Sequence, residues 1–462
     1  MFSSTTGSST FIKVEFAGKQ SDLLKKLYLC LISDKKDEGS GKRRLNESLI
    51  QFLTMQIIEV KTPEEKKEFI NFPKRLYKGD PDWVCQLDNQ IESIFDTELN
   101  YLFKQGEAAR WILKDDSGKT IGRIAAFIDY MRSKVNSQPT GGIGFFEVTD
   151  NKEAAFTLFD TGKKWLADRG MEAMDGPINF GENDNNWGLL VEGFMQQGFG
   201  MPYNKKYYKA FFEEYGFRNY FEQYSYHRVV RGADKKIELF PPRIMKIAEW
   251  LSKRPGYSFR HFEFSDKDRY IKDLVEIYNS AWAVFKEDFT PLDPEFLEAT
   301  FRKAKPIIEE DLVWFAYFND KPIAFFILFP DMNQILKHLN GRFHVWNMIR
   351  FVYYKLTHSM TRMRAVVGGV NPAYQNSGVE SAIFYHLYEV FKRKPWYNEL
   401  ELSWVGDFNP KMIAIYEALG AKQAKKHITY RFMINDKLEF RRYKDEMAQK
   451  QKEDKETAGQ EQ

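Results

Sequence analysis

The chain has 462 residues, of which 43% are hydrophobic and 29% charged, a balance typical of folded globular proteins rather than of disordered ones. This length exceeds one ordinary hydrophobic core and predicts two or three domains. The 68 basic and 65 acidic residues leave a net charge of +3, too little to favour nucleic-acid binding, and the 16% of aromatic residues indicate either a ring-rich core or cavities for an apolar ligand.

The cysteines and the apolar segments indicate the cellular compartment in which the protein works. Cys30 and Cys85 lie far apart and lack metal-ligand spacing, which is typical of a reducing compartment. No run approaches the ~20 apolar residues of a spanning helix, and the N-terminus lacks the pattern of a secretory signal. We therefore expect a cytoplasmic protein.

Both ends of the chain are polar. Residues 1–54 include the charged run from Asp34 to Arg44 and are expected to be a disordered extension. Met55 is an alternative start, because a strand-like segment follows it at once. Residues 436–462 are expected to form a charged tail.

From Met55 onward, strand and helix patterns alternate. Thr62 and Pro63 predict a helix start, with Thr as the cap and Pro in the first turn. The other elements expected in this half are a strand at 56–60, a hairpin of 109–114 and 120–130, a strand at 144–148, a helix at about 151–169, a strand near 171–175 and a helix at about 204–215.

The same order recurs after the prolines at 241–242. The expected elements are a strand at 257–264, helices at 266–283 and 294–305, a hairpin of 312–318 and 322–329, a strand at 364–370, a helix at 378–393, a strand at 399–405 and a helix at 410–419. Two copies of one mixed α+β unit explain the length, with domains predicted at residues 55–235 and 236–435.

The segment between the strand at 364–370 and the helix at 378–393 is a candidate anion site. It reads Asn371-Pro-Ala-Tyr-Gln-Asn-Ser-Gly378. A Gly-containing turn at a helix N-terminus presents unpaired backbone N–H groups and the positive end of the helix dipole, which suits a phosphate. Many helices begin after Pro and Gly without binding a ligand, so the context decides.

That context resembles a known superfamily. The C-terminal half is similar to the GNAT superfamily of acyl-CoA N-acyltransferases, whose characteristic positions are filled in matching order and spacing by Gln375, Gly378, Asn409, Tyr416 and Gly420. The fold class implied for the whole chain is α+β with a mixed sheet, in two tandem GNAT-like domains.

The resemblance implies roles for individual residues. The strand at 364–370 would splay from the strand at 399–405, so that its backbone pairs with the pantetheine arm of an acyl thioester. The donor-binding residues implied are Gly368, Val370, Gln375, Asn376, Ser377, Gly378 and Asn409. Tyr416 would protonate the departing thiolate, since a phenol of pKa ~10 can serve a thiol of pKa ~8.5. The alternatives are a packing role for Tyr416 and a helix N-cap role for Asn409.

Glu380 departs from the superfamily pattern, which usually has a small residue there. An inward-pointing carboxylate would repel the diphosphate of coenzyme A. Either Glu380 faces outward, or the donor is an acyl carrier protein, whose arm has one phosphodiester. The expected donor is therefore acyl-CoA or acyl-ACP, with the carrier protein as an alternative partner.

The first copy lacks both features. Residues 144–155 contain no Gln-x-x-Gly turn, and Phe212 stands where the second copy has Tyr416. This half is expected to be a scaffold or a wall of the acceptor site.

A second resemblance covers about residues 55 to 435. Gly-Phe-Phe-Glu147, Gly-Pro-Ile-Asn179 and Glu-Leu-Ser-Trp404 are similar to motifs of a bacterial tandem-GNAT family. Relatives of this family are linked to N-acylation of long-chain bases in bacterial sphingolipid synthesis. The resemblance implies acyl transfer to an amine, either a small molecule or a long-chain lipid.

The insert at 335–355 mixes Trp, Phe and Tyr with Arg, Lys and His. Such a segment can lie in a membrane interface or roof an acyl-chain tunnel, which would place the protein peripherally at the inner membrane face. The alternative is a helix packed across the two domains.

Other chemistry is less supported. No histidine pair has metal spacing, so no metal is expected. Candidate bases for the incoming amine are Asp407, Glu380 and Glu401, and a water relay would also serve. The competing hypotheses are a catalytically inactive GNAT-like module for cofactor or partner binding, and an aminoacyl-tRNA-dependent transferase, which the near-neutral charge disfavours.

Overall fold

The computed structural model describes residues 55–135, 138–181, 186–231, 241–282, 291–449 and 452. Residues 1–54, for which the sequence predicts disorder, lie outside the described residues. So do residues 450–451 and 453–462 of the predicted charged tail.

The N-terminal half contains all the strands and helices expected from its sequence, together with several short elements. In chain order these are β1 (Gln56–Glu59), α3 (Pro63–Leu76), α4 (Asp88–Ile94), η1 (Tyr101–Lys104), β2 (Gly106–Lys114), β3 (Thr120–Asp129), α5 (Tyr130–Val135), β4 (Thr140–Val148), α6 (Lys152–Ala167), β5 (Ala173–Gly176), β6 (Leu189–Glu192), α7 (Tyr208–Tyr215) and β7 (Arg218–Val229).

The C-terminal half repeats this order. It comprises α8 (Pro242–Ser252), β8 (Tyr257–His261), η2 (Phe264–Asp266), α9 (Lys267–Trp282), α10 (Pro294–Ala304), η4 (Glu310–Leu312), β9 (Val313–Phe318), β10 (Lys321–Pro330), α11 (Asn333–Leu336), α12 (Val345–Leu356), β11 (Arg362–Val370), η5 (Pro372–Tyr374), α13 (Val379–Arg393), β12 (Glu399–Gly406), α14 (Pro410–Ala418) and β13 (Lys422–Met433).

Local signals explain several boundaries. Thr62 and Glu65 form a capping box at the start of α3, with Pro63 in the first turn, as predicted. Asn319 and Asp320 both have positive φ, 48° and 61°, which is the backbone twist that a two-residue hairpin turn between β9 and β10 requires.

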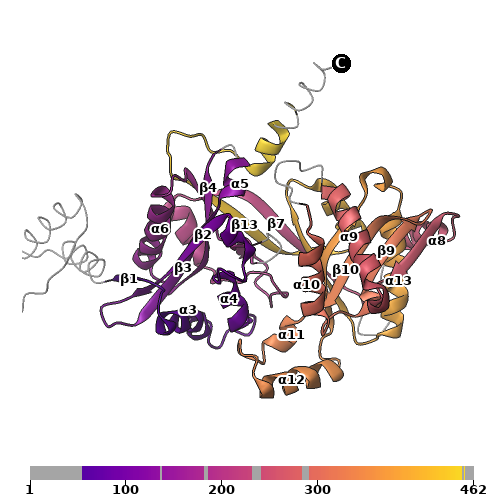
Figure 1. Ribbon diagram of the computed structural model, residues 1–462, viewed down its shortest axis with the longest axis horizontal. Helices are drawn as coiled ribbons and strands as arrows, with labels where there is room; N and C mark the ends of the chain where they lie inside the picture. The colour runs from indigo at the N-terminus through magenta and orange to yellow at the C-terminus, as the bar shows by residue number, and fades with distance from the viewer. Residues whose placement is uncertain are drawn as a thin grey trace, which may run out of the picture.

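The two halves exchange their last strands within one 13-stranded sheet. Twelve strands follow the order β1-β2-β3-β4-β5-β13-β7-β12-β11-β10-β9-β8, and β6 pairs with β13 outside this order. β13, the end of the C-terminal half, pairs with β5 of the N-terminal half, while β7 pairs with β12. The two strands also pair with each other, and they cross the centre of the molecule between its two groups of helices (Figure 1). Neither strand is among those expected from the sequence.

Helices cover both faces of the sheet in the C-terminal half. α13 and α8 pack on one face, around Ile383, Leu387 and Leu251, whereas α9 and α10 cover the other face, around Leu274 and Phe301. In the described part of the chain, no helix is long and apolar enough to cross a bilayer.

The exchange predicts that the halves depend on each other. Residues 55–231 expressed alone would lack β13, and residues 241–449 would lack β7, so each piece would expose unpaired strand edges and apolar side chains such as Tyr430 (1% exposed). We expect each piece alone to be insoluble or unfolded by circular dichroism, and co-expression to restore a folded complex. Proteolytic cleavage between Arg231 and Pro241 should leave the two pieces associated on a native gel. Two independently folded pieces would contradict this prediction.

Candidate functional site

The centre of the C-terminal half contains an opening between β11 and β12. These parallel strands pair only at Arg362–Glu399, Met363–Leu400 and Arg364–Glu401. Beyond these pairs β11 stays bonded to β10 as far as Val370, but it has no pairing with β12 in the described structure. Val366 to Gly368 and Ser403 are partly exposed although they lie in the middle of the sheet. The two strands therefore splay apart, as expected from the sequence.

The corresponding opening in the N-terminal half is closed. β4 and β5 also pair at three positions, from Thr140–Ala173 to Gly142–Asp175. The next segment then fills the gap, since Ile178 N–H donates to Ile143 O at 2.8 Å. A Cβ added at Gly144 would lie 1.9 Å from the carbonyl oxygen of Ile178. No pantetheine arm could pair with this stretch of β4, which agrees with a scaffold role for this half.

The turn between β11 and α13 presents backbone N–H groups. Asn376 (φ 63°) and Gly378 (φ 87°) are left-handed, and α13 begins without a side-chain cap. Its first N–H groups have no intrahelical acceptor, so they and the helix dipole favour an anion. Gln375 and Asn376 are exposed, whereas Ser377 Oγ is buried and has no hydrogen-bond partner among the described residues. A buried, unpaired hydroxyl beside a helix N-terminus is consistent with a ligand donor.

Glu380 lies in the first turn of α13, and its carboxylate accepts its own backbone N–H. Burial raises the pKa of this carboxyl, and the backbone hydrogen bond only partly offsets the effect. Glu380 therefore turns toward the helix N-terminus rather than into solvent. It would compete with a second phosphate at this position.

Gly378 offers a direct test of the turn. A Cβ here would meet Ile247 Cγ2 at 2.9 Å, and the φ of 87° strains any L residue. We expect Gly378→Ala to weaken donor binding about tenfold or more, measured by calorimetry. Gly79→Ala is the matched control, because Gly79 has φ 88° and open space around it. Both variants should lose about 1 kcal/mol of stability to backbone strain, and only the first should lose affinity. Equal donor affinities for the two variants would exclude this turn from the site.

Tyr416 on α14 points back to the opening. Its side chain is 5% exposed, its ring lies 5.4 Å from that of Tyr226, and its hydroxyl lies 3.2 Å from Ser403 Oγ on β12. Burial raises the pKa of Tyr416, while the hydrogen bond to Ser403 lowers it, and the net shift is upward. The phenol is therefore protonated at neutral pH. In the N-terminal half, Phe212 lies fully buried among other rings and has no hydroxyl to offer.

Of the other residues expected at the donor site, two lie on β11 and one lies at the start of α14. Gly368 and Val370 lie on β11 along the opening, where a Cβ on Gly368 would lie 2.5 Å from Phe326. Asn409 is the N-cap of α14, and its side chain accepts Met412 N–H at 3.2 Å. Ser403 was not singled out from the sequence. It belongs to the Glu-Leu-Ser-Trp motif, but nothing in that motif indicates a contact with Tyr416.

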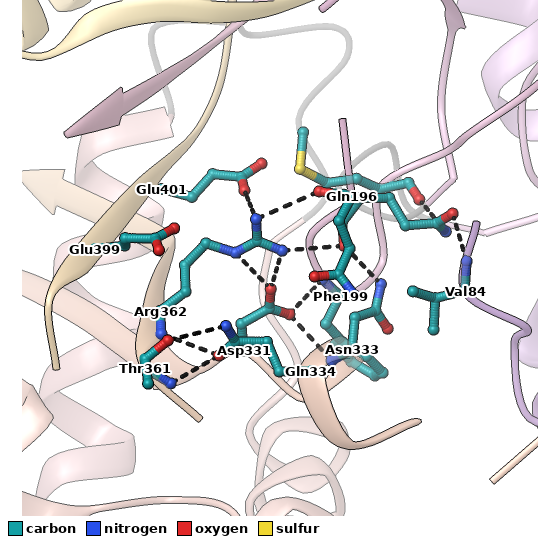
Figure 2. A network of polar contacts seen from close by, with 12 residues as sticks. Val84, Gln196, Phe199, Asp331, Asn333, Gln334, Thr361, Arg362, Glu399 and Glu401 are labelled. Carbon is teal, nitrogen blue, oxygen red and sulfur yellow. Dashed lines mark hydrogen bonds and ion pairs between the residues drawn. The ribbon is translucent and has the colours of Figure 1, made fainter. Parts of the chain in front are cut away.

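A buried polar network lies at the closed base of the opening (Figure 2). Asp331, which is fully buried, accepts hydrogen bonds from Arg362 Nε (2.7 Å), Phe199 N–H (2.9 Å) and Asn333 N–H (3.1 Å). Arg362 also donates to the backbone oxygens of Gln196 and Gln197. The loop of the N-terminal half that contains these residues is thereby fixed against the start of β11.

Glu401 joins the network from β12, opposite Arg364, at the last paired position. Its Oε1 accepts from Lys425 Nζ at 2.6 Å, and its Oε2 lies 3.5 Å from Arg362 Nη1 without a hydrogen bond in the described part of the chain. Burial alone would raise the pKa of Glu401, but Lys425 and Arg362 hold it below its usual value. Glu401 is therefore a buried, ion-paired carboxylate whose Oε2 accepts no hydrogen bond from the described residues.

The other two candidate bases are engaged. Asp407 accepts from Arg442 Nη2 at 2.9 Å and from Glu222 N–H at 3.1 Å. Glu380 bonds to its own helix. Glu401 is paired as well, and of the three it is the one at the last paired position of β11 and β12, where the opening begins. Within the described ranges, no group of three or more His, Cys, Asp or Glu side chains could hold a metal ion.

Comparison with known proteins places the fold. No protein-family model matches the chain. The chain is 26% identical over 380 residues to Protein YghO of Escherichia coli (strain K12), covering 80% of this chain and 93% of that protein. It is 26% identical over 388 residues to Bacterial ceramide synthase of Caulobacter vibrioides (strain NA1000 / CB15N), covering 81% of this chain and 97% of that protein.

Among solved structures, the chain is similar to a tandem GNAT protein from the clavulanic acid biosynthesis pathway. The TM-score is 0.51 at 10% identity, and the match covers 82% of this chain and 98% of that protein. The mixed sheet and the repeated element order describe one α+β unit in two copies. The chain therefore has the fold of two tandem GNAT-like domains.

Proposed function

We propose that the protein is an N-acyltransferase that transfers an acyl group from a thioester to an amine at the opening between β11 and β12. One observation carries this proposal: the opening is free in the C-terminal half, where Tyr416 borders it, and is closed by Ile178 in the N-terminal half. Because only one of the two described openings can admit a pantetheine arm, the doubled fold fits an enzyme with one site.

The reaction needs no covalent enzyme intermediate. The amine attacks the thioester carbonyl, and backbone N–H groups of β11 that face the opening stabilise the oxyanion of the tetrahedral intermediate. When the intermediate collapses, the C–S bond breaks and Tyr416 donates its proton to the departing thiolate. Glu401, directly or through water, removes the proton of the amine. The hydrogen bond to Ser403 fixes the direction of the Tyr416 hydroxyl.

The donor site that we propose consists of the turn from Gln375 to Gly378, with Gly368 and Val370 along the arm. Asn409 would act by fixing the start of α14, because its side chain already caps that helix. The position of Glu380 at the same helix N-terminus favours a donor with one phosphodiester, acyl-ACP, over acyl-CoA with its diphosphate.

The proposed acceptor is a long-chain lipid amine. The similarity to a protein named bacterial ceramide synthase, over most of both chains, supports this class of acceptor. We propose that the protein works in the cytoplasm and reaches its acceptor at the inner face of the membrane.

The proposal is tested by following free thiol while acyl-CoA and acyl-ACP of increasing chain length are offered with a set of amines. We expect thiol release only when an amine is present, with one amide formed per thiol. Glu380→Gln should improve saturation by acyl-CoA more than by acyl-ACP. If no thioester is consumed with any amine, the fold serves as a binding module and the enzymatic proposal fails.

A further inference from the structure

α12 and Phe343, just before it, form an exposed apolar patch. Eight of the fifteen large apolar side chains that are exposed in the described structure lie between residues 343 and 356. Their exposed fractions range from 46% for Phe343 to 74% for Trp346. This surface, here called the α12 face, consists of Phe343, Val345, Trp346, Met348, Ile349, Val352, Tyr353 and Leu356.

The opposite side of α12 is firmly anchored. Asn347 donates to the backbone oxygens of Leu339 (3.0 Å) and Arg342 (2.8 Å). Phe351 packs in a small cluster that contains Ile335 of α11 and Val84 of the N-terminal half. The buried residues Asn347 and Phe351 are four positions apart, so they lie on one side of the helix. The α12 face lies on the other side, where no described residue covers it.

Charged side chains within the α12 segment have one sign, although acidic residues 309–311 border its end at Leu356. No acidic residue occurs between Met332 and Val379. Arg342 and Arg350 are exposed beside the face, and Lys337 is exposed just before it. An apolar helix face flanked by cations is complementary to a surface with an apolar interior and anionic groups. A bilayer that contains acidic lipids has both properties.

α12 has 12 residues, too few to span a bilayer, but it can lie in the plane of the interface. Trp346 and Tyr353 are the residue types that settle at the headgroup level. Figure 1 shows α12 at the lower edge of the molecule, outside the sheet.

The position of α12 along the chain relates this face to the site. α12 leads into the start of β11, whereas the donor turn follows the end of β11. The 9 residues of β11 extend over about 30 Å. A molecule resting on the α12 face would hold its donor turn away from the membrane and the base of the opening closer to it.

We propose that the α12 face docks the protein on an anionic bilayer, so that a lipid amine approaches from the membrane side and the thioester from the aqueous side. Docking itself does not require catalysis, whereas its link to the acceptor rests on the proposed function.

The test is flotation of the full chain with vesicles of phosphatidylcholine alone and of phosphatidylcholine with 30% phosphatidylglycerol. We expect binding to the anionic vesicles, weakened by salt. Trp346→Ser with Ile349→Ser should reduce partitioning about tenfold or more, and Arg350→Gln about fivefold. Trp250→Ser is the matched control, because Trp250 is 59% exposed on α8, outside the α12 face. It should float like the unaltered protein.

Two results would overturn the proposal. One is absence of the unaltered protein from floated vesicles. The other is a dimer, measured by light scattering, that Trp346→Ser with Ile349→Ser dissociates, since the face would then bind a second copy. Thiol release with long-chain and with water-soluble amines is measured on the same samples. Activity without flotation refutes docking alone, and flotation without activity refutes the enzymatic proposal alone.

Discussion

Replacing Tyr416 by Phe is expected to reduce the rate of acyl transfer by about 10²-fold or more, because general acid catalysis contributes on that scale. The ring of Phe fills the same space against Tyr226, so the loss should appear in kcat with little change in KM for the donor. The folded protein loses only the 3.2 Å contact with Ser403. Steady-state thiol release measures the effect.

Tyr397→Phe is the matched control for this prediction. Tyr397 is 1% exposed in the same half, and its hydroxyl donates to Glu309 at 2.6 Å, away from the opening. Loss of this hydrogen bond should lower stability by about 1 kcal/mol without lowering kcat. An unchanged rate in Tyr416→Phe would refute the assignment of Tyr416 as the acid. Equal losses of kcat in both variants would indicate a structural effect instead.

Asp331→Ala is expected to destabilise the protein by about 3–5 kcal/mol. The substitution leaves the buried Arg362 guanidinium without its main counter-ion, and the remaining carboxylate, Glu401, lies 3.5 Å away. It also removes the acceptor of Phe199 N–H, which fixes this loop of the N-terminal half. The midpoint of urea unfolding should fall accordingly, and activity should fall with it even where the protein remains folded.

Glu249→Ala is the control, because it removes a solvent-exposed ion pair instead of a buried one. Glu249 pairs with Lys253 at 2.7 Å on the surface of α8, where both side chains are more than half exposed. Its removal should leave the unfolding midpoint unchanged. If the midpoint of urea unfolding of Asp331→Ala is as little changed as that of Glu249→Ala, the buried network does not stabilise the contact between the two halves.

The sequence predicted the elements that are specified locally. The capping box at Thr62, the hairpin at Asn319 and the start of α13 at Gly378 each depend on a few neighbouring residues. β7 and β13 were not predicted, because each gains its partners from the opposite half of the chain. β13 also buries Arg431 (2% exposed), whose countercharge, Asp175, lies in the opposite half of the chain.

The site follows the same rule. The strand and helix order expected from the sequence puts the turn at Gly378 directly after β11 and Tyr416 on the helix after β12, while their roles, which the resemblance implied, stay predictions. The choice of Glu401 among three carboxylates rests on its place at the last paired position of β11 and β12, which the sequence does not state. The closure of the N-terminal opening by Ile178 is likewise a matter of backbone path, which no motif states.

The most direct test of the account is hydrogen–deuterium exchange with and without a non-hydrolysable thioether analogue of the donor, on CoA and on the carrier protein. The account predicts one analogue bound per chain, with new protection of backbone amides in residues 364–380. Amides in residues 140–155 of the N-terminal half should exchange as before. Protection of both segments, or of the N-terminal segment alone, would contradict the proposal that the acyl thioester binds at the opening between β11 and β12 and not at the closed copy.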